Sequence, residues 1–386
     1  MKVICAKGEL LRGVQTVQTA VTGKGGLPIL SNILLETEEK KLKLVSTDLE
    51  VGIKCNIAAE ILKKGAVTLP AKKFSDIVRE MPDKDIQIEI AADNKATISC
   101  EKVIFKVMGL PKDEFPILPE FKHENTFKIK QGLLKDIIRK TIFAISTDET
   151  RYVLNGLYLQ TSGNKIEVVA TDGRRLAYIV GGSLPKTGKR LNIIIPAKAI
   201  NELNRIIDRE GEVTVSFSEN QISFELDDIL LVSRLIEGRF PNYEQVIPKS
   251  CPLKLNIKTE ELLSAVKRVA LLAPEKSESI KLTLSDNKML ISANTQGVGE
   301  AEEELSVAYK GAKFEVAYNP RYIADVLKNL DTEEATLEFT DSASPAIIRP
   351  ETKENKGPAK EGKGAKETKE TRETEQYLCV IMPMRI

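Results

Sequence analysis

The sequence predicts an α+β protein built from three copies of one domain. Three short segments repeat one pattern in front of a helical run, at 69–72, 195–198 and 318–321, and they lie about 125 residues apart. Two smaller signals return at nearly the same offset: Thr47-Asp48 as Thr171-Asp172, and Phe115-Pro116 as Phe240-Pro241. A module repeated three times is typical of architectures that stack or close on themselves.

One segment stands apart from this repeat. Residues 351–376 carry no large apolar side chain, so they cannot bury a core and we expect a disordered insertion in a hairpin loop. Its charges balance, and we hypothesise a neutral, solvated tether that the fold tolerates. The rest of the chain divides into three domains, predicted at 1–120, 127–248 and 253–386, and each is long enough to bury its own core.

The first domain shows an internal duplication. Its first half gives a strand, a helix and three strands, at 2–6, 9–21, 29–37, 41–46 and 51–58. The same order returns in its second half, at 66–69, 72–81, 86–91, 96–100 and 103–108. Each domain is therefore expected to be a doubled β-α-β-β-β unit, and the chain is expected to hold six such units.

The helices are expected to pack on sheets through one apolar face. Apolar stripes recur in the three domains, at Leu10, Leu11, Val14, Val17 and Val21, at Leu133, Leu134, Ile137, Ile138 and Ile142, and at Leu262, Leu263, Val266 and Val269. The opposite faces lean modestly toward Lys and Arg, with acids among them. One such helix is most often a solvated face, but the same leaning at equivalent places of a repeat favours a shared basic surface.

Composition places the chain among globular proteins. With 42% hydrophobic and 29% charged residues and no apolar run near the roughly 20 residues of a membrane helix, it is expected to be cytoplasmic and to have no membrane contact. The five cysteines lack C-x-x-C spacing, which argues against a disulfide framework and against a zinc site. We expect neither a metal nor another cofactor.

The net charge limits any role on nucleic acid. The chain has 57 basic and 56 acidic residues, a formal charge of +1. A protein that grips DNA by counterion release normally carries a strong positive excess. A weakly basic lining within an otherwise acidic shell would instead suit a protein that encloses the duplex and slides, because phosphate contacts do not fix sequence register.

Six motifs in the three domains carry a resemblance to a known family. They are 27–33 (LPILSNI), 46–50 (STDLE), 151–156 (RYVLNG), 171–176 (TDGRRL), 239–243 (RFPNY) and 380–386 (VIMPMRI). With these motifs the chain resembles the beta subunit of bacterial DNA polymerase III, the sliding clamp, from Met1 to Ile386. Only the insertion after Pro350 departs substantially from the family pattern.

The resemblance implies an architecture and a function. Family members pair head to tail into a closed ring, with helices lining the hole and sheets outside, and a heterologous interface of this kind must close or propagate. The implied function is a non-catalytic processivity factor that encircles duplex DNA and tethers the replicative polymerase. The implied partners are a second copy, double-stranded DNA, the clamp loader, the alpha subunit of DNA polymerase III, and other polymerases and repair factors that carry clamp-binding peptides.

The resemblance also implies a groove for partner peptides between the second and third domains. Its residues would be Leu154, Thr171, Gly173, Arg175, Leu176, Pro241, Val246, Asn319, Tyr322, Ile381, Met382, Pro383, Met384 and Arg385. Flexible methionines beside leucine and valine suit a site that serves many peptides. Without the resemblance, the apolar run 377–382 would be a buried last strand. Many relatives carry an aromatic residue near Ser277, so this wall of the groove is expected to differ.

Two more residue sets follow from the resemblance. The candidate DNA contacts are Arg12, Lys24, Tyr152, Lys198 and Arg205. The candidate dimer interface joins the strand at 103–108 to the strand at 300–305, with Lys73, Phe74, Ile77 and Met81 on one side and Leu271, Leu272, Glu302 and Glu303 on the other. The acids of that second strand could instead only protect an exposed edge from aggregation.

Two other function classes remain open. The chain has a single histidine, His123, and no nucleophile or metal motif, so the sequence gives little support to a catalytic function. A metal-dependent phosphoesterase built on Asp48 and Asp172 is the enzymatic alternative, although their repetition at matching positions favours turns in which Asp caps backbone groups. The third class is a repeat scaffold that binds proteins and never DNA.

Overall fold

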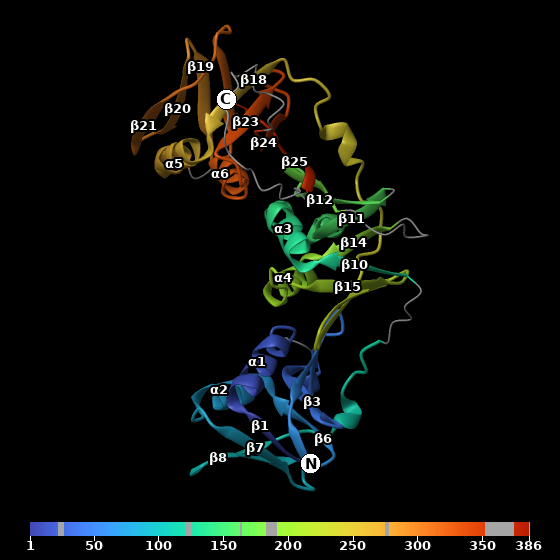
Figure 1. Ribbon diagram of the computed structural model, residues 1–386. Coiled ribbons are helices and arrows are strands. Elements are labelled where there is room, and N and C mark those ends of the chain that lie inside the picture. The colour runs from blue at the N-terminus through green and yellow to red at the C-terminus, as the bar shows by residue number, and fades with distance from the viewer. Residues whose placement is uncertain are drawn as a thin grey trace, which may run out of the picture. The chain divides into compact units, whose positions relative to one another are not determined.

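Four antiparallel sheets and six helices make up the described part of the chain (Figure 1). The computed structural model describes residues 1–21, 27–119, 125–162, 164–182, 191–274, 278–351 and 374–385. These residues form two compact units. Unit 1 contains Met1–Lys135 and Ile195–Glu237, and unit 2 contains the other described residues.

Unit 1 holds two of the sheets. One has the strand order β5 (Glu60–Lys63), β1 (Lys2–Ala6), β7 (Asp85–Ile90), β8 (Lys95–Cys100) and β9 (Val103–Met108). The other has the order β10 (Thr126–Lys130), β15 (Glu212–Phe217), β16 (Gln221–Leu226), β17 (Ile229–Arg234), β4 (Val51–Ala58), β3 (Lys41–Thr47), β2 (Asn32–Glu38) and β6 (Ala66–Pro70). Pairing of β17 with β4 joins strands of the first and second predicted domains into one sheet.

Unit 2 repeats this arrangement. Its large sheet has the order β14 (Asn192–Pro196), β11 (Gly156–Ser162), β12 (Lys165–Thr171), β13 (Arg175–Gly181), β25 (Thr374–Ile381), β24 (Ala346–Pro350), β23 (Glu334–Phe339) and β18 (Leu253–Lys258). Its small sheet has the order β21 (Gly299–Ser306), β20 (Lys288–Thr295), β19 (Ile280–Ser285) and β22 (Phe314–Tyr318). Pairing of β13 with β25 joins strands of the second and third predicted domains in this sheet. Strands of the middle predicted domain therefore occur in both units, since β17 pairs with β4 in unit 1.

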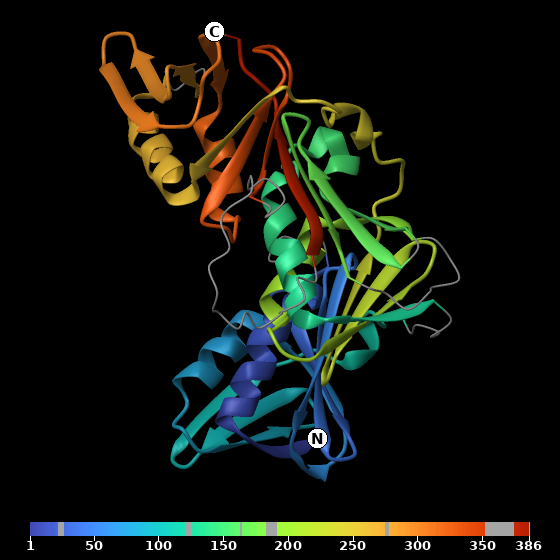
Figure 2. The ribbon, with the colours of Figure 1, turned by 45° about the horizontal axis from the view of Figure 1, so that its top comes forward.

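The helices pack on these sheets through the predicted apolar faces. They are α1 (Lys7–Gln18), α2 (Ala71–Glu80), α3 (Gln131–Thr141), α4 (Ala197–Ile206), α5 (Thr259–Val269) and α6 (Pro320–Lys328). Within each unit a pair lies side by side, α1 with α2 and α5 with α6 (Figure 2). Leu10, Val14 and Val17 of α1 are fully buried, and Gly13 lets the helix approach β3 and β4, because a Cβ there would lie 2.6 Å from Leu44 Cδ1. No helix in these ranges is both long and apolar enough to span a membrane.

Each of the six repeated motifs has the predicted β-α-β-β-β order, from β1-α1-β2-β3-β4 to β22-α6-β23-β24-β25. Four details differ from the sequence predictions. Helix α1 ends at Gln18, and the predicted strand 29–37 begins as the 3-10 turn η1 (Pro28–Ser31) because Pro28 fixes a helical φ at its first position. Strand β5 was not predicted, and β25 begins at Thr374, inside the segment assigned to the insertion. The remainder of that insertion, 352–373, lies outside the described residues.

Candidate functional sites

The predicted groove residues all lie in unit 2, on segments that the fold brings together. Strand β13 pairs with β25, which sets Arg175 opposite Ile381 and Leu176 opposite Val380. The chain beyond β25 is then held on both sides, since Met382 N donates to Arg174 O at 2.9 Å and Met384 N donates to Ala317 O at 2.8 Å. These backbone pairings fix the tail residues beside the turn that precedes β13.

That turn, between β12 and β13, is held by its own side chains. Asp172 Oδ1 accepts from the backbone N–H groups of Arg174 (2.8 Å) and Arg175 (3.0 Å), and Thr171 Oγ1 accepts from Gly173 N. Gly173 has a φ of +83°, a conformation that side chains rarely adopt. The predicted capping role of Asp172 is therefore confirmed, and the same bonds recur at Thr47 and Asp48.

Arg175 is the centre of an ionic cluster among the predicted groove residues. Its guanidinium donates to Asp172 Oδ2 at 3.1 Å, to Asp325 Oδ2 at 2.8 Å and to Phe143 O. It also lies over the ring of Tyr322, 4.6 Å from the centroid. Only 10% of the Arg175 side chain is exposed. The guanidinium is thus fully engaged within the chain, and it positions the turn and α6 rather than reaching into solvent.

The other predicted groove residues divide into buried ones, which would form the floor of the predicted groove, and ones with accessible surface, which would form its rim. Leu154, Leu176 and Ile381 are buried, and so is Asn319, whose side chain caps α6 by accepting from Arg321 N. The rim consists of residues with accessible surface: Thr171, Gly173, Pro241, Val246, Tyr322, Met382, Pro383, Met384 and Arg385. The predicted wall near Ser277 lies outside the described residues.

An aromatic cluster that the sequence reasoning missed fixes the segment that carries Pro241 and Val246. Phe240 stacks on Tyr158 of β11, with centroids 4.6 Å apart, and Tyr243 lies against both Tyr158 and Tyr178. Gln160 Nε2 donates to Tyr243 Oη at 2.7 Å and to Glu167 Oε2 at 2.6 Å. The available signal was one tyrosine in each of β11 and β13, together with the two aromatic residues of the 239–243 motif.

These tyrosines predict a loss of stability at alkaline pH. Burial, followed by the charge of Glu167, raises the pKa of Tyr178 to about 12 from the ordinary 10.0. The folded state then holds a proton that the unfolded state releases, so stability is complete below pH 10 and falls as the pH rises toward 12. Urea unfolding at pH 8 and pH 11 should show a smaller difference for Tyr178→Phe than for the unmodified chain.

The exposed Tyr152 offers the matched control for this measurement. Tyr152→Phe should leave the urea midpoint at pH 8 unchanged, because 58% of the surface of Tyr152 is in contact with solvent. An equal pH dependence in Tyr178→Phe and the unmodified chain would contradict the assignment.

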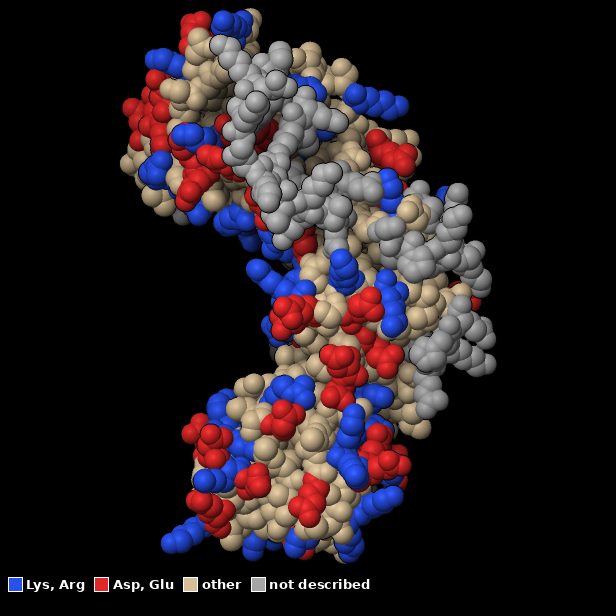
Figure 3. All heavy atoms as spheres, in the orientation of Figure 1, with Lys and Arg blue, Asp and Glu red and all other residues tan. Residues whose placement is uncertain are grey.

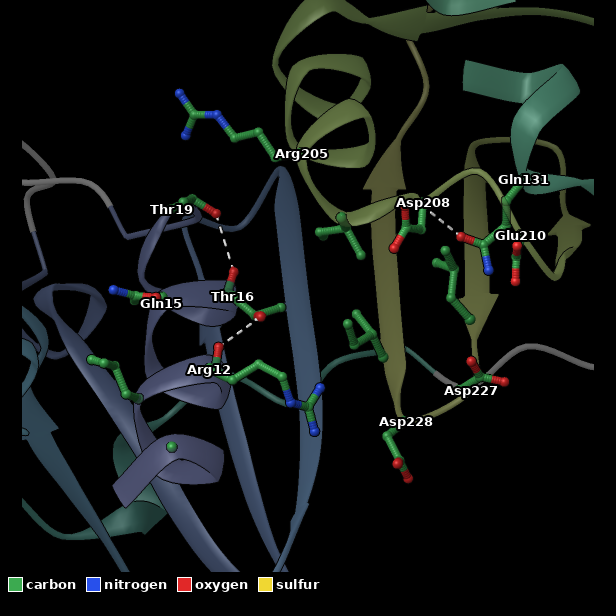
Figure 4. Close-up of a pocket in the computed structure, with 15 residues that line it drawn as sticks. Arg12, Gln15, Thr16, Thr19, Gln131, Arg205, Asp208, Glu210, Asp227 and Asp228 are labelled. Atoms are coloured by element: carbon green, nitrogen blue, oxygen red, sulfur yellow. Dashed lines mark hydrogen bonds between the residues drawn. The ribbon is translucent and has the colours of Figure 1, made fainter. Parts of the chain in front are cut away.

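Two predicted DNA contacts, Arg12 and Arg205, line one cavity of about 790 Å³ in unit 1 (Figure 4). The Arg12 guanidinium donates to Glu9 Oε2 at 2.9 Å, and Arg205, with 65% of its side chain exposed, lies 3.6 Å from Glu202 Oε1. The opposite side of the cavity is acidic, with Asp208, Glu210, Asp227 and Asp228. This surface therefore pairs each arginine with a carboxylate and would hold a phosphate only weakly.

The other predicted DNA contacts have different surroundings. Lys198, in the first turn of α4, pairs its ammonium with Asp48 Oδ2, and only 7% of the Asp48 side chain is exposed. Tyr152 is exposed on the turn η4 (Glu149–Leu154). Lys24 lies outside the described residues. Lys198 thus has a structural partner, which its position in the sequence did not reveal.

The variant Lys198→Met is expected to lower the free energy of unfolding by about 1 to 3 kcal/mol, because Asp48 then keeps a shielded carboxylate oxygen without its cation. Lys72 occupies the same place in the repeated Pro-Ala-Lys pattern but is exposed, so Lys72→Met should change stability by less than about 0.5 kcal/mol. Chemical denaturation measures both. If Lys198→Met and the unmodified chain had the same free energy of unfolding, the Lys198–Asp48 pair would contribute nothing to stability.

The predicted dimer residues of unit 1 lie around an open sheet edge. Strand β9 has a neighbour on one side only and exposes Ile104 (62%) and Met108 (60%). Lys73 is exposed and Ile77 is half-buried on α2, whereas Phe74 and Met81 are buried in the core. The burial of these last two side chains does not support the prediction that they contact a partner.

The predicted dimer residues of unit 2 surround the edge strand β21. Acidic side chains gather over this strand in Figure 3. Glu302 of β21 is exposed. Glu303 is different, because Arg268 of α5 binds both of its oxygens at 2.5 and 2.9 Å. Leu271 next to α5 has 82% of its surface exposed, and Leu272 is half-buried. The sequence could not reveal that Glu303 already has a cation within the chain.

The residues of the enzymatic alternative have structural partners. Asp48 and Asp172 cap backbone groups in equivalent turns, and their remaining oxygens bind Lys198 and Arg175. Within the described ranges, no three His, Cys, Asp or Glu side chains are grouped to hold a metal ion, and every described cysteine is buried and free. His123 lies outside those ranges.

Comparisons with known proteins give one family. Models of the DNA polymerase III beta subunit match in succession, its N-terminal domain at residues 1–119, its central domain at 128–242 and its C-terminal domain at 244–358. The chain is 34% identical to the Beta sliding clamp of Escherichia coli strain K12 over 90% of this chain and 95% of that protein. It is 33% identical to the Beta sliding clamp of Chlamydia pneumoniae over 90% and 95%.

Solved structures agree with these relatives. A crystal structure of a sliding clamp (DNA polymerase III subunit beta) from Pseudomonas aeruginosa, bound to griselimycin, superimposes with a TM-score of 0.90 at 31% identity over the whole of both chains. A DNA polymerase sliding clamp from Bacillus subtilis gives a TM-score of 0.90 at 28% identity over 100% and 99%. The chain belongs to the DNA polymerase III beta subunit family, the DNA sliding clamps, and contains three clamp domains.

Proposed function

We propose that this DNA sliding clamp works as a closed ring of two copies that encircles duplex DNA. The observation that carries the proposal is the pair of unmatched edges, the apolar β9 in unit 1 and the acidic β21 in unit 2. An edge strand with exposed apolar side chains is a template for pairing with another chain, and two different edges give a head-to-tail contact that must close. The domains meeting there would be 1–120 and 253–386.

The ring holds DNA by enclosure and only weakly by charge. Arg12 and Arg205 are our candidate phosphate contacts in unit 1, with Tyr152 a further candidate, and carboxylates accompany both arginines. Compensated charges lower the cost of leaving one phosphate for the next, which favours sliding. Lys198 contributes less in this scheme, because Asp48 holds its ammonium.

The groove of unit 2 is proposed to bind the peptides of partner proteins. Its floor is apolar and its rim carries Pro241, Val246 and Met382, which suit the apolar anchors of an extended peptide. The partners would be the polymerase III alpha subunit, the clamp loader, other polymerases and repair factors, all in the cytoplasm. The clamp itself performs no reaction and confers processivity by tethering.

Topology provides the test of enclosure. The clamp is loaded with a clamp loader on nicked circular DNA, and the DNA is then cut once with a restriction enzyme. A ring that encircles the duplex should stay on the circle at high salt and leave the linear product through its ends. Retention that is the same on circular and linear DNA, or loss at high salt from both, would exclude enclosure and favour adhesion or a scaffold that never binds DNA.

A further inference from the structure

A second cavity, of about 740 Å³, lies in unit 1 on the large sheet and has no assigned role. Lys43 and Val45 of β3 and Lys54 of β4 form its base, and alternation places them on the face opposite α1. Its wall is the segment from Phe115 to Pro119, in which Ile117 is 95% exposed.

The same place in unit 2 is filled by the chain itself. In unit 1 the sheet register aligns Leu34, Val45 and Lys54 across β2, β3 and β4. In unit 2 the equivalent register aligns Tyr158, Val169 and Tyr178 across β11, β12 and β13. The ring of Tyr243, three residues after Phe240, covers this second row at centroid distances of 6.1 and 5.8 Å.

Gly52 explains why this place stays open in unit 1. Leu118 follows Phe115 by three residues, as Tyr243 follows Phe240, but its side chain turns toward Gly52 of β4. A Cβ on Gly52 would lie 2.3 Å from Leu118 Cδ2, so the leucine occupies space that Leu176 fills in unit 2. Phe115 packs against Val45 and Leu118 lies against this cluster, so the room left to the cavity lies over Leu34 and Lys54, in the row where unit 2 holds an aromatic ring.

Among the described residues, some charged side chains around the cavity are paired with an opposite charge and others are not. Glu36 is bound by Lys43 at 2.9 Å and by Lys112 at 3.0 Å. Lys54 is half-buried on the cavity base, and no carboxylate in the described part of the chain pairs with it. A ligand with an acidic group would therefore find a cation ready at this end of the site.

We propose that this cavity is a second docking site, which takes an aromatic side chain of a partner protein together with an acidic residue next to it. The ring would lie over Leu34, beside the segment from Phe115 to Leu118, in the row that Tyr243 covers in unit 2, and the carboxylate would reach Lys54. This site is separate from the peptide groove of unit 2, and its occupancy does not depend on that groove.

Short peptides test the two requirements. The probes are acetyl-Gly-Tyr-Asp-Gly-amide, the Asn version without the charge, and the Ala version without the ring, added to the full chain and followed by saturation-transfer NMR. The Tyr-Asp peptide should bind, and each altered peptide should bind about tenfold more weakly. Leu34→Tyr and Lys54→Tyr each place a tyrosine where unit 2 has Tyr158 and Tyr178. Each variant should abolish the saturation-transfer signal of the Tyr-Asp peptide.

A thermal melt establishes that each variant is folded, and two independent filling variants protect the test against the failure of one. Arg174→Ala in unit 2 is the matched control and should leave binding of the Tyr-Asp peptide unchanged. Absence of binding to the unmodified chain, equal binding of the Ala peptide, or binding that persists in both filled variants would overturn the proposal. Loss of binding in the filled variants alone would support it.

Discussion

The variant Arg175→Met is expected to lose about 3 to 5 kcal/mol of unfolding free energy and most of its affinity for a partner peptide. Methionine keeps much of the volume but leaves the carboxylates of Asp172 and Asp325, both mostly buried, without their shared cation. It also removes the donor to Phe143 O and the cation over Tyr322. Urea unfolding gives the first quantity, and polarisation of a labelled polymerase-derived peptide gives the second.

Two further variants make the Arg175 result specific. Arg175→Lys keeps the charge but cannot bridge three acceptors with one planar fork, so it should recover only a small part of the loss. Arg174→Ala should be neutral, because the exposed Arg174 is fixed by its backbone and its side chain bonds to none of the described residues. A groove that binds peptide normally in the Met variant would mean that Arg175 does not position it.

The repeat made most of the fold predictable from the sequence. Strands β1, β4 and β9 have the predicted bounds because alternation and short turns limit them on both sides. Strand β5 escaped because its four residues are mostly exposed and lack alternation, and its position depends on pairing with β1. The end of α1 at Gln18 likewise depends on tertiary contacts, since Val21 continues the apolar period beyond the helix.

The candidate sites were less predictable, because charge pairing crosses large sequence distances. The predicted groove residues all lie in unit 2, but the resemblance could not tell that Arg175 bridges Asp172 and Asp325 or that Asp48 holds Lys198. The burial of Phe74 and Met81 in the core could not be predicted from the sequence. An amphipathic period predicts an apolar face, but it does not tell whether that face packs on the core or contacts a partner. Tyr243 belongs to the motif 239–243, but its bonds to Gln160 and Glu167 were not predicted, because these two residues lie on strands far away in sequence.

The substitution Ile104→Asp is expected to convert the ring into single chains. Closure of two copies creates two equal seams, so every change in one edge counts twice. Loss of one buried isoleucine costs about 1.5 to 3 kcal/mol per seam, which weakens the dimer about a thousandfold before charge is counted. The new carboxylate would also face the acidic strand β21, whose Glu302 is exposed.

Leu62→Asp is the matched control for the Ile104 variant, because Leu62 is an exposed apolar residue on β5, the opposite edge of the same five-stranded sheet. Its substitution should leave the particle at the mass of two chains in sedimentation equilibrium, whereas Ile104→Asp should give the mass of one. Dissociation by both variants would indicate general destabilisation of the sheet. A stable pair in Ile104→Asp would place the seam elsewhere, since an acidic group cannot be buried against acids on two seams without lowering the affinity.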